Sequence, residues 1–269
     1  MASRRAKRPA KPRSGASGYV RTGASTIASP GPVLAPAGAV PGRFSLSLPR
    51  LSLADGTLEA LKWLALVLMT LDHVNKYLLA DSQPMLFAAG RLAAPLFAAV
   101  LGYNLARPGL TAGAHGRICR RLAICGAIAS VPFVALGGLG WGWWPLNIAF
   151  TLLVATAAAQ LLELGGRRHA LLAIALVLVG GSSVEFWWPA IGIVLCVRAY
   201  SRRPGWLALL GWVGCTALLQ LINGNAWALA SLPLIVLARQ VDIALPKLRT
   251  VFYVYYPAHL TVLWLLKHL

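Results

Sequence analysis

One apolar stretch, residues 58–80, carries side chains that could perform proton-transfer chemistry. It reads LEALKWLALVLMTLDHVNKYLLA, and it is long enough to cross a bilayer, because about 20 apolar residues suffice. Titratable groups such as Asp72 and His73 are costly inside a spanning helix unless they face a protein or water-filled interior. A histidine, whose ordinary pKa is about 6.5, can accept a proton near neutral pH. We therefore expect His73 to act as a general base, with a purely packed core histidine as the alternative.

The neighbouring carboxylate, Asp72, is not expected to orient His73. Adjacent residues on a helix point about 100° apart and do not face each other. Asp72 is therefore expected to pair with Arg91 or with Lys76, and a structural ion pair between two helices is the alternative. Glu185 is the better candidate for a carboxylate that orients His73. One stripe of the helix holds four side chains: Lys62, Met69, His73 and Lys76.

Composition identifies the class of protein. The 269 residues are 58% hydrophobic and 12% charged, with a mean hydropathy of +0.68. That charged fraction is about half of the roughly 25% typical of a soluble domain. The ten tryptophans also favour membrane interfaces. We predict an all-α polytopic transmembrane helix bundle.

The N-terminal segment is strongly basic. The chain carries a net charge of +18, and nine Lys and Arg residues precede the first acid. This tail, residues 1–55, is rich in Ala, Pro, Ser and Gly and is predicted to be disordered. We expect it to contact anionic lipid headgroups rather than nucleic acid, and it lacks the compact apolar region of a secretory signal. The four cysteines show no paired spacing, so neither a disulfide nor a metal is expected.

About nine spans, within a range of eight to ten, are predicted from the apolar segments. Basic loops alternate along the chain with loops that have almost no Lys or Arg. By the positive-inside rule, the N-terminus lies in the cytoplasm and the C-terminus outside, in the inner membrane of a bacterium. The domain that follows the tail, residues 56–269, shows no internal repeat. The expected spans are residues 58–80, 85–106, 122–136, 145–164, 170–179, 185–198, 206–222, a segment ending near 239, and 250–266, and the expected basic loops are 107–121, 167–169, 198–203 and 239–249.

This topology gives several polar residues a similar depth. At about 1.5 Å per residue, His73 lies roughly 22 Å from the cytoplasmic end of its helix, in the outer half. Arg91, Asn147 and Glu185 stand near the outer ends of their own spans, and His259 is near the middle of the last one. We therefore expect one site assembled from several helices.

Four segments resemble the TraX family. Leu61–Ala65 followed by Met69–His73 is similar to the family's opening signature, and residues 90–97 (GRLAAPLF) contain its R-x-A-x-P-L-F core. Residues 147–152 (NIAFTL) resemble its N-x-x-F-T-L segment, and residues 252–260 (FYVYYPAHL) resemble its closing F-Y-x-x-Y-P-x-H-L. Glu185 departs from the pattern, because the family has an Asp followed by a Gly-rich stretch there.

The resemblance covers about residues 58–269 and implies an activity. The family includes the F-pilin acetylase of conjugative plasmids and the TrbP-like conjugal transfer proteins, and it is similar in outline to broader membrane acyltransferases. It therefore implies N-acetylation of a pilin-like peptide, with acetyl-CoA as the acyl donor and with no metal.

Transfer of an acyl group to an amine needs a base and hydrogen-bond donors for the developing oxyanion. His73 would be the base, and Arg91 and Asn147 the donors, although Arg91 could instead reach outward for solvation. Lys62 could meet the phosphates of acyl-CoA or simply reach the membrane surface.

The last predicted helix offers a second group of residues. Tyr255, Tyr256 and His259 share one face, and Pro257 frees a backbone carbonyl beside them. This arrangement is either a packing kink or part of the site, and the resemblance favours the site. The six expected catalytic residues are His73, Asp72, Arg91, Asn147, Glu185 and His259, and the three expected donor-binding residues are Lys62, Tyr255 and Tyr256.

Two other functions remain open at this point. A proton-coupled transporter could use Asp72, His73 and Glu185 as a relay, although the lack of an internal repeat argues against an inverted-repeat transporter. Haem could be held by His73 and His259.

Overall fold

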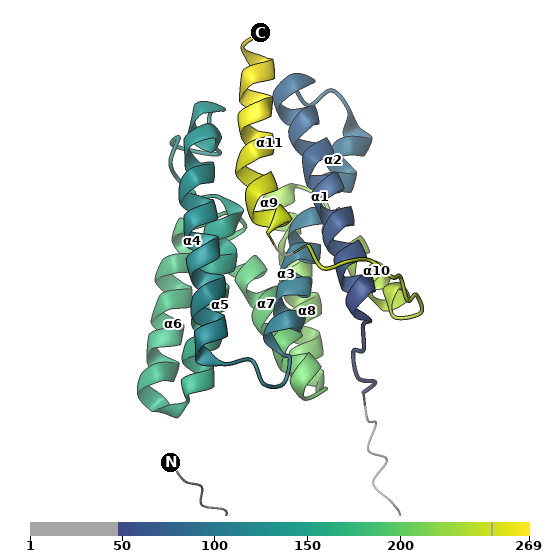
Figure 1. Ribbon diagram of the computed structural model, residues 1–269, viewed down its shortest axis with the longest axis vertical. Coiled ribbons are helices and arrows are strands. Elements are labelled where there is room, and N and C mark those ends of the chain that lie inside the picture. The colour runs from purple at the N-terminus through teal and green to yellow at the C-terminus, as the bar shows by residue number, and fades with distance from the viewer. Residues whose placement is uncertain (1–47, 249) are drawn as a thin grey trace, which may run out of the picture. The chain divides into compact units, whose positions relative to one another are not determined.

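The computed structural model describes residues 48–248 and 250–269, and Figure 1 shows them as packed helices. Within this part of the chain, the regular structure is helical apart from one isolated parallel bridge between Leu146 and Val184. The predicted all-α class is confirmed. The elements are α1 (Asp55–Leu78), α2 (Pro84–Gly90), α3 (Ala93–Leu105), α4 (Ala112–Ala135), α5 (Ile148–Leu164), α6 (Gly166–Ser183), α7 (Trp187–Arg202), α8 (Trp206–Leu218), α9 (Gln220–Asn223), the 3₁₀ helix η1 (Trp227–Ala230), α10 (Ser231–Ala238) and α11 (Val251–Lys267).

Helix α7 forms the centre of the packing. It contacts α3, α5, α6 and α8, and its side chains Ile191, Ile193, Val194 and Val197 are fully buried together with Leu96 of α3. A second apolar cluster lies where α1, α4 and α11 meet and includes Met69, Phe133 and Leu260. The candidate site residues of α1 and α11 lie next to this second cluster.

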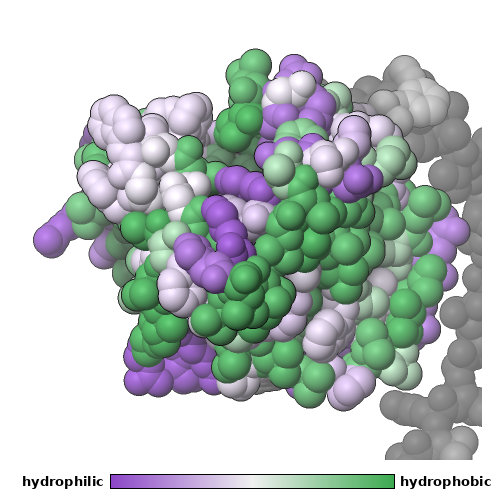
Figure 2. Space-filling view, turned by 90° about the horizontal axis from the view of Figure 1, so that it is seen from above, coloured by the Kyte–Doolittle hydropathy of each residue, from purple (hydrophilic) through white to green (hydrophobic). Residues whose placement is uncertain are grey.

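Several helices carry apolar outward faces. On α4, Ile124, Ile128 and Val131 are exposed, and α6 and α8 show similar rows. Figure 2 shows large hydrophobic areas on the face seen from above. Exposed apolar surface of this extent suits contact with lipid. Three described stretches are long and apolar enough to cross a membrane: Pro84–Leu105, Ala112–Ala135 and Trp206–Asn223.

The observed helices differ from the predicted spans in instructive ways. Helix α1 is not among the three stretches, because its charges exceed what an apolar span tolerates. The predicted second span is broken at Arg91 into α2 and α3. Helix α4 begins at Ala112, so the arginines 117–121 lie on a helix and not in a loop as predicted. Thr111 caps that helix, because its side chain accepts a hydrogen bond from the amide of Ala114.

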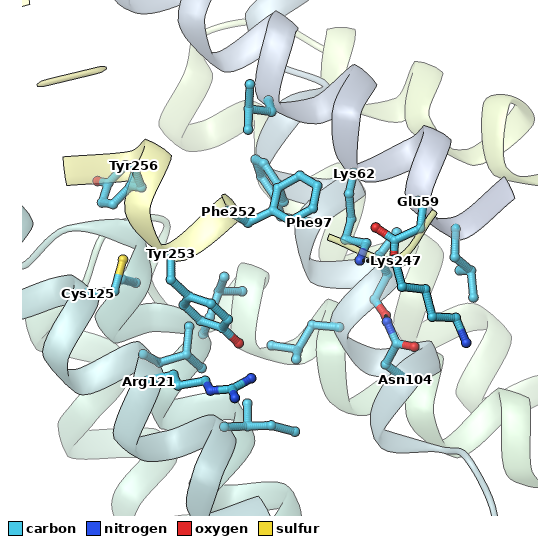
Figure 3. Close-up of a pocket in the computed structure, with 18 of the residues that line it drawn as sticks. Glu59, Lys62, Phe97, Asn104, Arg121, Cys125, Lys247, Phe252, Tyr253 and Tyr256 are labelled. Carbon is cyan, nitrogen blue, oxygen red and sulfur yellow. Dashed lines mark hydrogen bonds and ion pairs between the residues drawn. The ribbon is translucent and has the colours of Figure 1, made fainter. Parts of the chain in front are cut away.

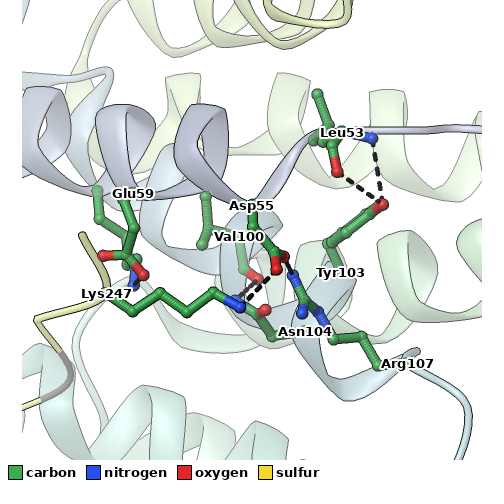
Figure 4. A network of polar contacts seen from close by, with 9 residues as sticks. Leu53, Asp55, Glu59, Val100, Tyr103, Asn104, Arg107 and Lys247 are labelled. Carbon is green, nitrogen blue, oxygen red and sulfur yellow. Dashed lines mark hydrogen bonds and ion pairs between the residues drawn. The ribbon is translucent and has the colours of Figure 1, made fainter. Parts of the chain in front are cut away.

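The last residues of the predicted tail are packed against the helices. Leu51 and Leu53 are buried, and the Tyr200 hydroxyl donates to the carbonyl of Pro49 at 2.7 Å. The amide of Leu53 donates to the Tyr103 hydroxyl, as Figure 4 shows. The ordered domain therefore begins before residue 55, while the disorder predicted for residues 1–47 concerns residues outside the described part.

The start of α1 is tied to the connector that leads into α11. Thr57 donates from Oγ1 to the carbonyl of Val241 at 2.5 Å. A Cβ at Gly56 would lie 1.5 Å from the carbonyl oxygen of Ile243, so only glycine allows this approach. Asp55 forms ion pairs with Arg107 and Lys247 (Figure 4). These contacts fix α1 relative to α3 and to the connector.

Helices α3 and α7 come together at Gly102. A Cβ at this position would lie 2.4 Å from the carbonyl oxygen of Val194, which is backbone and cannot move aside easily. Small residues at such points let helix backbones approach closely. The contact between α3 and α7 therefore depends on a glycine at this position.

We predict that Gly102→Ala destabilises the protein by about 1–3 kcal/mol, the usual cost of overpacking a core. Gly116→Ala is the matched control, because a Cβ at Gly116 meets nothing within 4 Å and alanine favours a helix by up to about 1 kcal/mol over glycine. Thermal unfolding of both variants in the same detergent measures the difference. Equal stability of the two variants would contradict the close approach of α3 and α7.

Candidate functional site

Two cavities adjoin inside the helices. The larger, about 430 Å³, is called here the basic cavity, and the smaller, about 170 Å³, the polar chamber. Both volumes are lined by one stripe of α1: Lys62 and Met69 face the basic cavity, and Met69, His73 and Lys76 face the polar chamber. This is the stripe identified from the sequence. The residues that line both cavities are Met69, Phe97, Ile148 and Tyr256.

The two cavities follow one another along the helices. On α4, Arg117, Arg121 and Cys125 line the basic cavity and Phe133 lines the polar chamber. Helix α11 follows the same order, with Tyr253 in the basic cavity and Tyr256 at both. In Figure 1, α1, α4 and α11 rise toward the same end. At 1.5 Å per residue, Lys62 and His73 are about 16 Å apart along α1.

His73 and His259 form a hydrogen-bonded pair between α1 and α11. Nδ1 of His259 lies 3.1 Å from the carbonyl oxygen of Tyr255, which can only accept, so this nitrogen carries the hydrogen. Nε2 of the neutral His259 ring must then accept, and Nδ1 of His73, at 2.8 Å, donates to it. Neutral His73 therefore keeps an unprotonated Nε2, and its ring lines the polar chamber.

The ring of His73 contacts a second histidine. Glu185 was the better candidate for a carboxylate that orients His73, if there is one, and the structure places His259 at Nδ1 of His73. The two imidazole rings are almost parallel, with 2° between their planes. His259 is buried and lines neither cavity, so it lies behind His73 as a positioning residue.

Asp72 pairs with Arg91, one of the two partners expected from the sequence. The guanidinium of Arg91 donates to Oδ2 of Asp72 at 2.5 Å and also lies 4.3 Å from the centroid of the Phe87 ring. A Cβ at Gly90 would lie 2.4 Å from the Cβ of Asp72, so the glycine lets α2 approach α1. The break between α2 and α3 places Arg91 in the wall of the polar chamber.

Glu185 reaches the polar chamber from a non-helical crossing between α6 and α7. Its amide donates to the carbonyl of Leu146 at 2.8 Å, and Thr151 Oγ1 donates to the backbone carbonyl of Glu185 at 2.6 Å. The next residue, Phe186, has a φ of 59°, which is strained for a residue with a side chain. Among the described residues, Glu185 and Lys76 both line the chamber and neither forms an ion pair.

Asn147 lies outside both cavities. Its side-chain oxygen accepts from the amide of Ala149 and caps α5. Its Nδ2 donates to the carbonyl of Gly126 at 3.0 Å and to Oγ of Ser130 at 3.1 Å. Both amide hydrogens are used in this arrangement, so none is left for a substrate oxyanion. Asn147 holds α5 against α4, and an Asn directly before an apolar helical run is also typical of a helix N-cap.

The tyrosines of α11 are divided between the two cavities. Tyr255 lines the basic cavity, and its hydroxyl lies 2.9 Å from Oγ1 of Thr70 on α1. Its ring is nearly parallel to that of His259, with centroids 5.2 Å apart. Tyr256 lines both cavities. Pro257 stands within α11 beside these residues.

The basic cavity carries more cations than acids. Lys62 is paired with Glu59 at 2.5 Å, and its ammonium also lies 4.9 Å from the Phe252 centroid. Figure 3 shows Lys62, Arg121, Lys247 and the aromatic rings around one space. Sequence reasoning missed the arginines of α4 because it assigned them to a loop, although their i, i+4 spacing could have shown a common face. The cations that line this cavity are Lys62, Arg107, Arg117, Arg121 and Lys247.

The described residues contain no cluster of three His, Cys, Asp or Glu side chains placed to hold a metal ion. His73 and His259 are joined by a 2.8 Å contact between nitrogens. An ion bound by two imidazole nitrogens at about 2.0–2.1 Å each would need these nitrogens roughly 3.3–4 Å apart, depending on the angle at the metal. The pair as built therefore does not fit a shared metal or haem iron.

Comparison with known proteins places the chain in a family. The sequence model of the family described as TraX protein matches residues 57–267. The chain belongs to the TraX family. Protein TraX of Escherichia coli strain K12 is 32% identical over 227 residues, which is 79% of this chain and 88% of that protein. A second Escherichia coli protein of the same name shows the same identity and coverage. No solved structure matches the chain.

The resemblance found in the sequence is thus confirmed. The TraX match covers α1 from its third residue to the end of α11 and includes every residue that lines the two cavities except Asp55. Together with the three stretches long enough to span a bilayer, TraX membership indicates a membrane protein.

We predict that Asn147→Ala lowers the free energy of unfolding by about 2 kcal/mol or more, because it removes a helix cap and leaves the buried carbonyl of Gly126 with one donor fewer. Ser130→Ala, which removes only one of the two acceptors of the Asn147 amide, should cost about 1 kcal/mol. Chemical denaturation of both variants checks this. Full stability of Asn147→Ala would show that the amide is free for another role.

Proposed function

We propose that this protein is an integral-membrane acyltransferase that transfers an acetyl group from acetyl-CoA to the N-terminal amine of a pilin-like peptide during conjugal transfer. The observation that carries the proposal is the unprotonated Nε2 of His73 in a chamber that adjoins a basic cavity. Membership of the TraX family supports the role in conjugal transfer.

His73 has the geometry of a general base. Its donation to His259 fixes the tautomer, so that Nε2 points its lone pair away from α11. An α-amino group has an ordinary pKa of about 8 and is partly neutral near pH 7. A histidine base is strong enough to remove the proton that the amine loses on attack. His259 supports this tautomer without touching the substrate.

The reaction proceeds by addition and elimination at the thioester carbonyl. The amine nitrogen forms a bond to the carbonyl carbon, the C–S bond breaks, and the proton taken by His73 passes to the departing thiolate of CoA. Lys76 and Arg91 line the same chamber. Their positive charges stabilise the oxyanion that forms on the carbonyl oxygen. Glu185 is placed to hold the ammonium form of the acceptor on arrival.

The orientation of the cavities suits a donor that enters from the cytoplasm. In this proposal the protein has an inner-membrane, multi-pass topology with its N-terminus in the cytoplasm, as the positive-inside rule favours. The basic cavity then faces the cytoplasmic acetyl-CoA. The polar chamber then lies toward the outside, beside Asp81 and Leu139. The enzyme would pass the acyl group part of the way across the bilayer.

We predict that His73→Ala lowers acetyl transfer by about 10²–10⁴-fold, the usual contribution of a general base. The assay follows radiolabelled acetyl-CoA into a synthetic pilin peptide with a free N-terminus, using the full chain in proteoliposomes. His169→Ala is the control, because His169 is half-buried on α6 and lines neither cavity.

Acetyl transfer by His73→Ala at the wild-type rate would contradict the role of His73 as the general base. Proton-coupled movement of a solute by the wild-type chain, with no acylation at any time, would replace the acyltransferase with a transporter that uses Asp72, His73 and Glu185.

A further inference from the structure

Two arginines of the basic cavity form no ion pair with the residues that the structure describes. Arg117 and Arg121 line the cavity from adjacent turns of α4, about 6 Å apart on one face. All seven acidic residues of the chain lie in its described part, and four of them take part in its ion pairs: Asp55, Glu59, Asp72 and Glu163. None of these pairs includes Arg117 or Arg121.

The other cations of the cavity are already engaged. Lys62 is paired with Glu59, and Arg107 and Lys247 are paired with Asp55. Arginine presents a planar fork of donors that matches the oxygens of a phosphate. Two such forks that face one cavity without partners attract an anion with more than one negative group.

Aromatic rings stand beside these arginines. The guanidinium of Arg121 lies 6.0 Å from the centroid of the Tyr253 ring, and Phe252 lines the same cavity. Figure 3 shows Tyr253 and Arg121 side by side at the edge of the space. Aromatic side chains in a positively charged groove are the usual platform for a nucleobase. A phosphorylated nucleotide therefore fits the chemistry of this wall better than a bare anion does.

We infer that Arg117 and Arg121 bind the phosphate groups of the adenosine end of the acyl-CoA donor, with its pantetheine arm passing Met69 and Tyr256 into the polar chamber. This assignment rests on the proposed function. It adds that the donor lies with its nucleotide in the basic cavity and its acyl end in the polar chamber. Arg121 and Phe133 are about 18 Å apart along α4. This distance is close to the roughly 16 Å between Lys62 and His73 along α1. A long, flexible arm is what connects a nucleotide to a reacting thioester over such a distance.

Binding of CoA itself, which has no acyl group to transfer, tests the inference without requiring turnover. The full chain is placed in nanodiscs of phosphatidylcholine, and the Kd for CoA is measured for the wild type, for Arg117→Gln/Arg121→Gln and for Arg120→Gln. Arg120 is the matched control, because it is exposed on the same helix and does not line the cavity. The double variant should bind CoA at least about tenfold more weakly, since it loses charge-assisted hydrogen bonds, and Arg120→Gln should bind as the wild type does.

Two competing ligands test the inference on the wild-type chain. Adenosine 3′,5′-bisphosphate should displace CoA at a much lower concentration than pantetheine, which has no phosphate. Equal affinity of the double variant and the wild type for CoA would overturn the inference. So would displacement by pantetheine at the same concentration as by the bisphosphate.

An anionic lipid headgroup offers the same phosphate chemistry. Native mass spectrometry of the chain from phosphatidylglycerol nanodiscs separates the two sources. Lipid retained by the wild type and lost in the double variant, together with no CoA binding in phosphatidylcholine, would assign the arginines to lipid and overturn the nucleotide site.

The failure of this inference can be distinguished from a failure of the proposed function. Acetyl transfer with a KM for acetyl-CoA that is unchanged in the double variant would overturn the phosphate site alone. Arginine-dependent CoA binding without acetyl transfer would overturn the acyltransferase alone. If both hold, the double variant should raise the KM for acetyl-CoA with little change in kcat, and the KM for S-acetylpantetheine should stay as in the wild type.

Discussion

A polar group inside an apolar helix bundle must find a partner or face a cavity, because its burial without one costs several kcal/mol. The arrangement of this protein follows from that constraint. Asp72 is half-buried against Arg91, Asn147 uses its whole amide between two helices, and His73 donates to His259. Lys76 and Glu185, which form no ion pair among the described residues, line the polar chamber. The chamber is therefore the place where two opposite charges remain available to a substrate.

The stripe of α1 could be predicted from the sequence because it depends on local geometry alone. Residues three and four apart face one side of a helix, and Lys62, Met69, His73 and Lys76 do line successive parts of the two cavities. The ion pair of Asp72 with Arg91 could also be predicted. The two side chains have opposite charges, and helical geometry turns Asp72 away from His73. The contact of His73 with His259 could not be predicted, because it depends on how α1 packs against α11, and the two residues are 186 positions apart in the chain. Glu185 was the more obvious carboxylate, but its backbone is fixed to Leu146 and Thr151.

Charge counting misled where a helix carries basic residues along one face. Arg117, Arg120 and Arg121 marked a cytoplasmic loop by the positive-inside rule, yet they occupy the first turns of α4. The rule concerns which side of the membrane a residue is on and not whether it is helical. The difference matters for function, because only a helix sets Arg117 and Arg121 on the same face, toward the basic cavity, and directs Arg120 elsewhere.

We propose that the two cavities form one path that a single donor molecule occupies. A structure of the full chain with a non-reactive acetyl-CoA analogue tests this most directly. The protein would be held in a lipid nanodisc, with the thioester replaced by a ketone that cannot be cleaved. We predict phosphate density beside Arg117 and Arg121, an arm that passes between Met69 and Tyr256, and the ketone in the polar chamber beside His73. A nucleotide bound elsewhere, or an acyl end that remains in the basic cavity, would contradict the account.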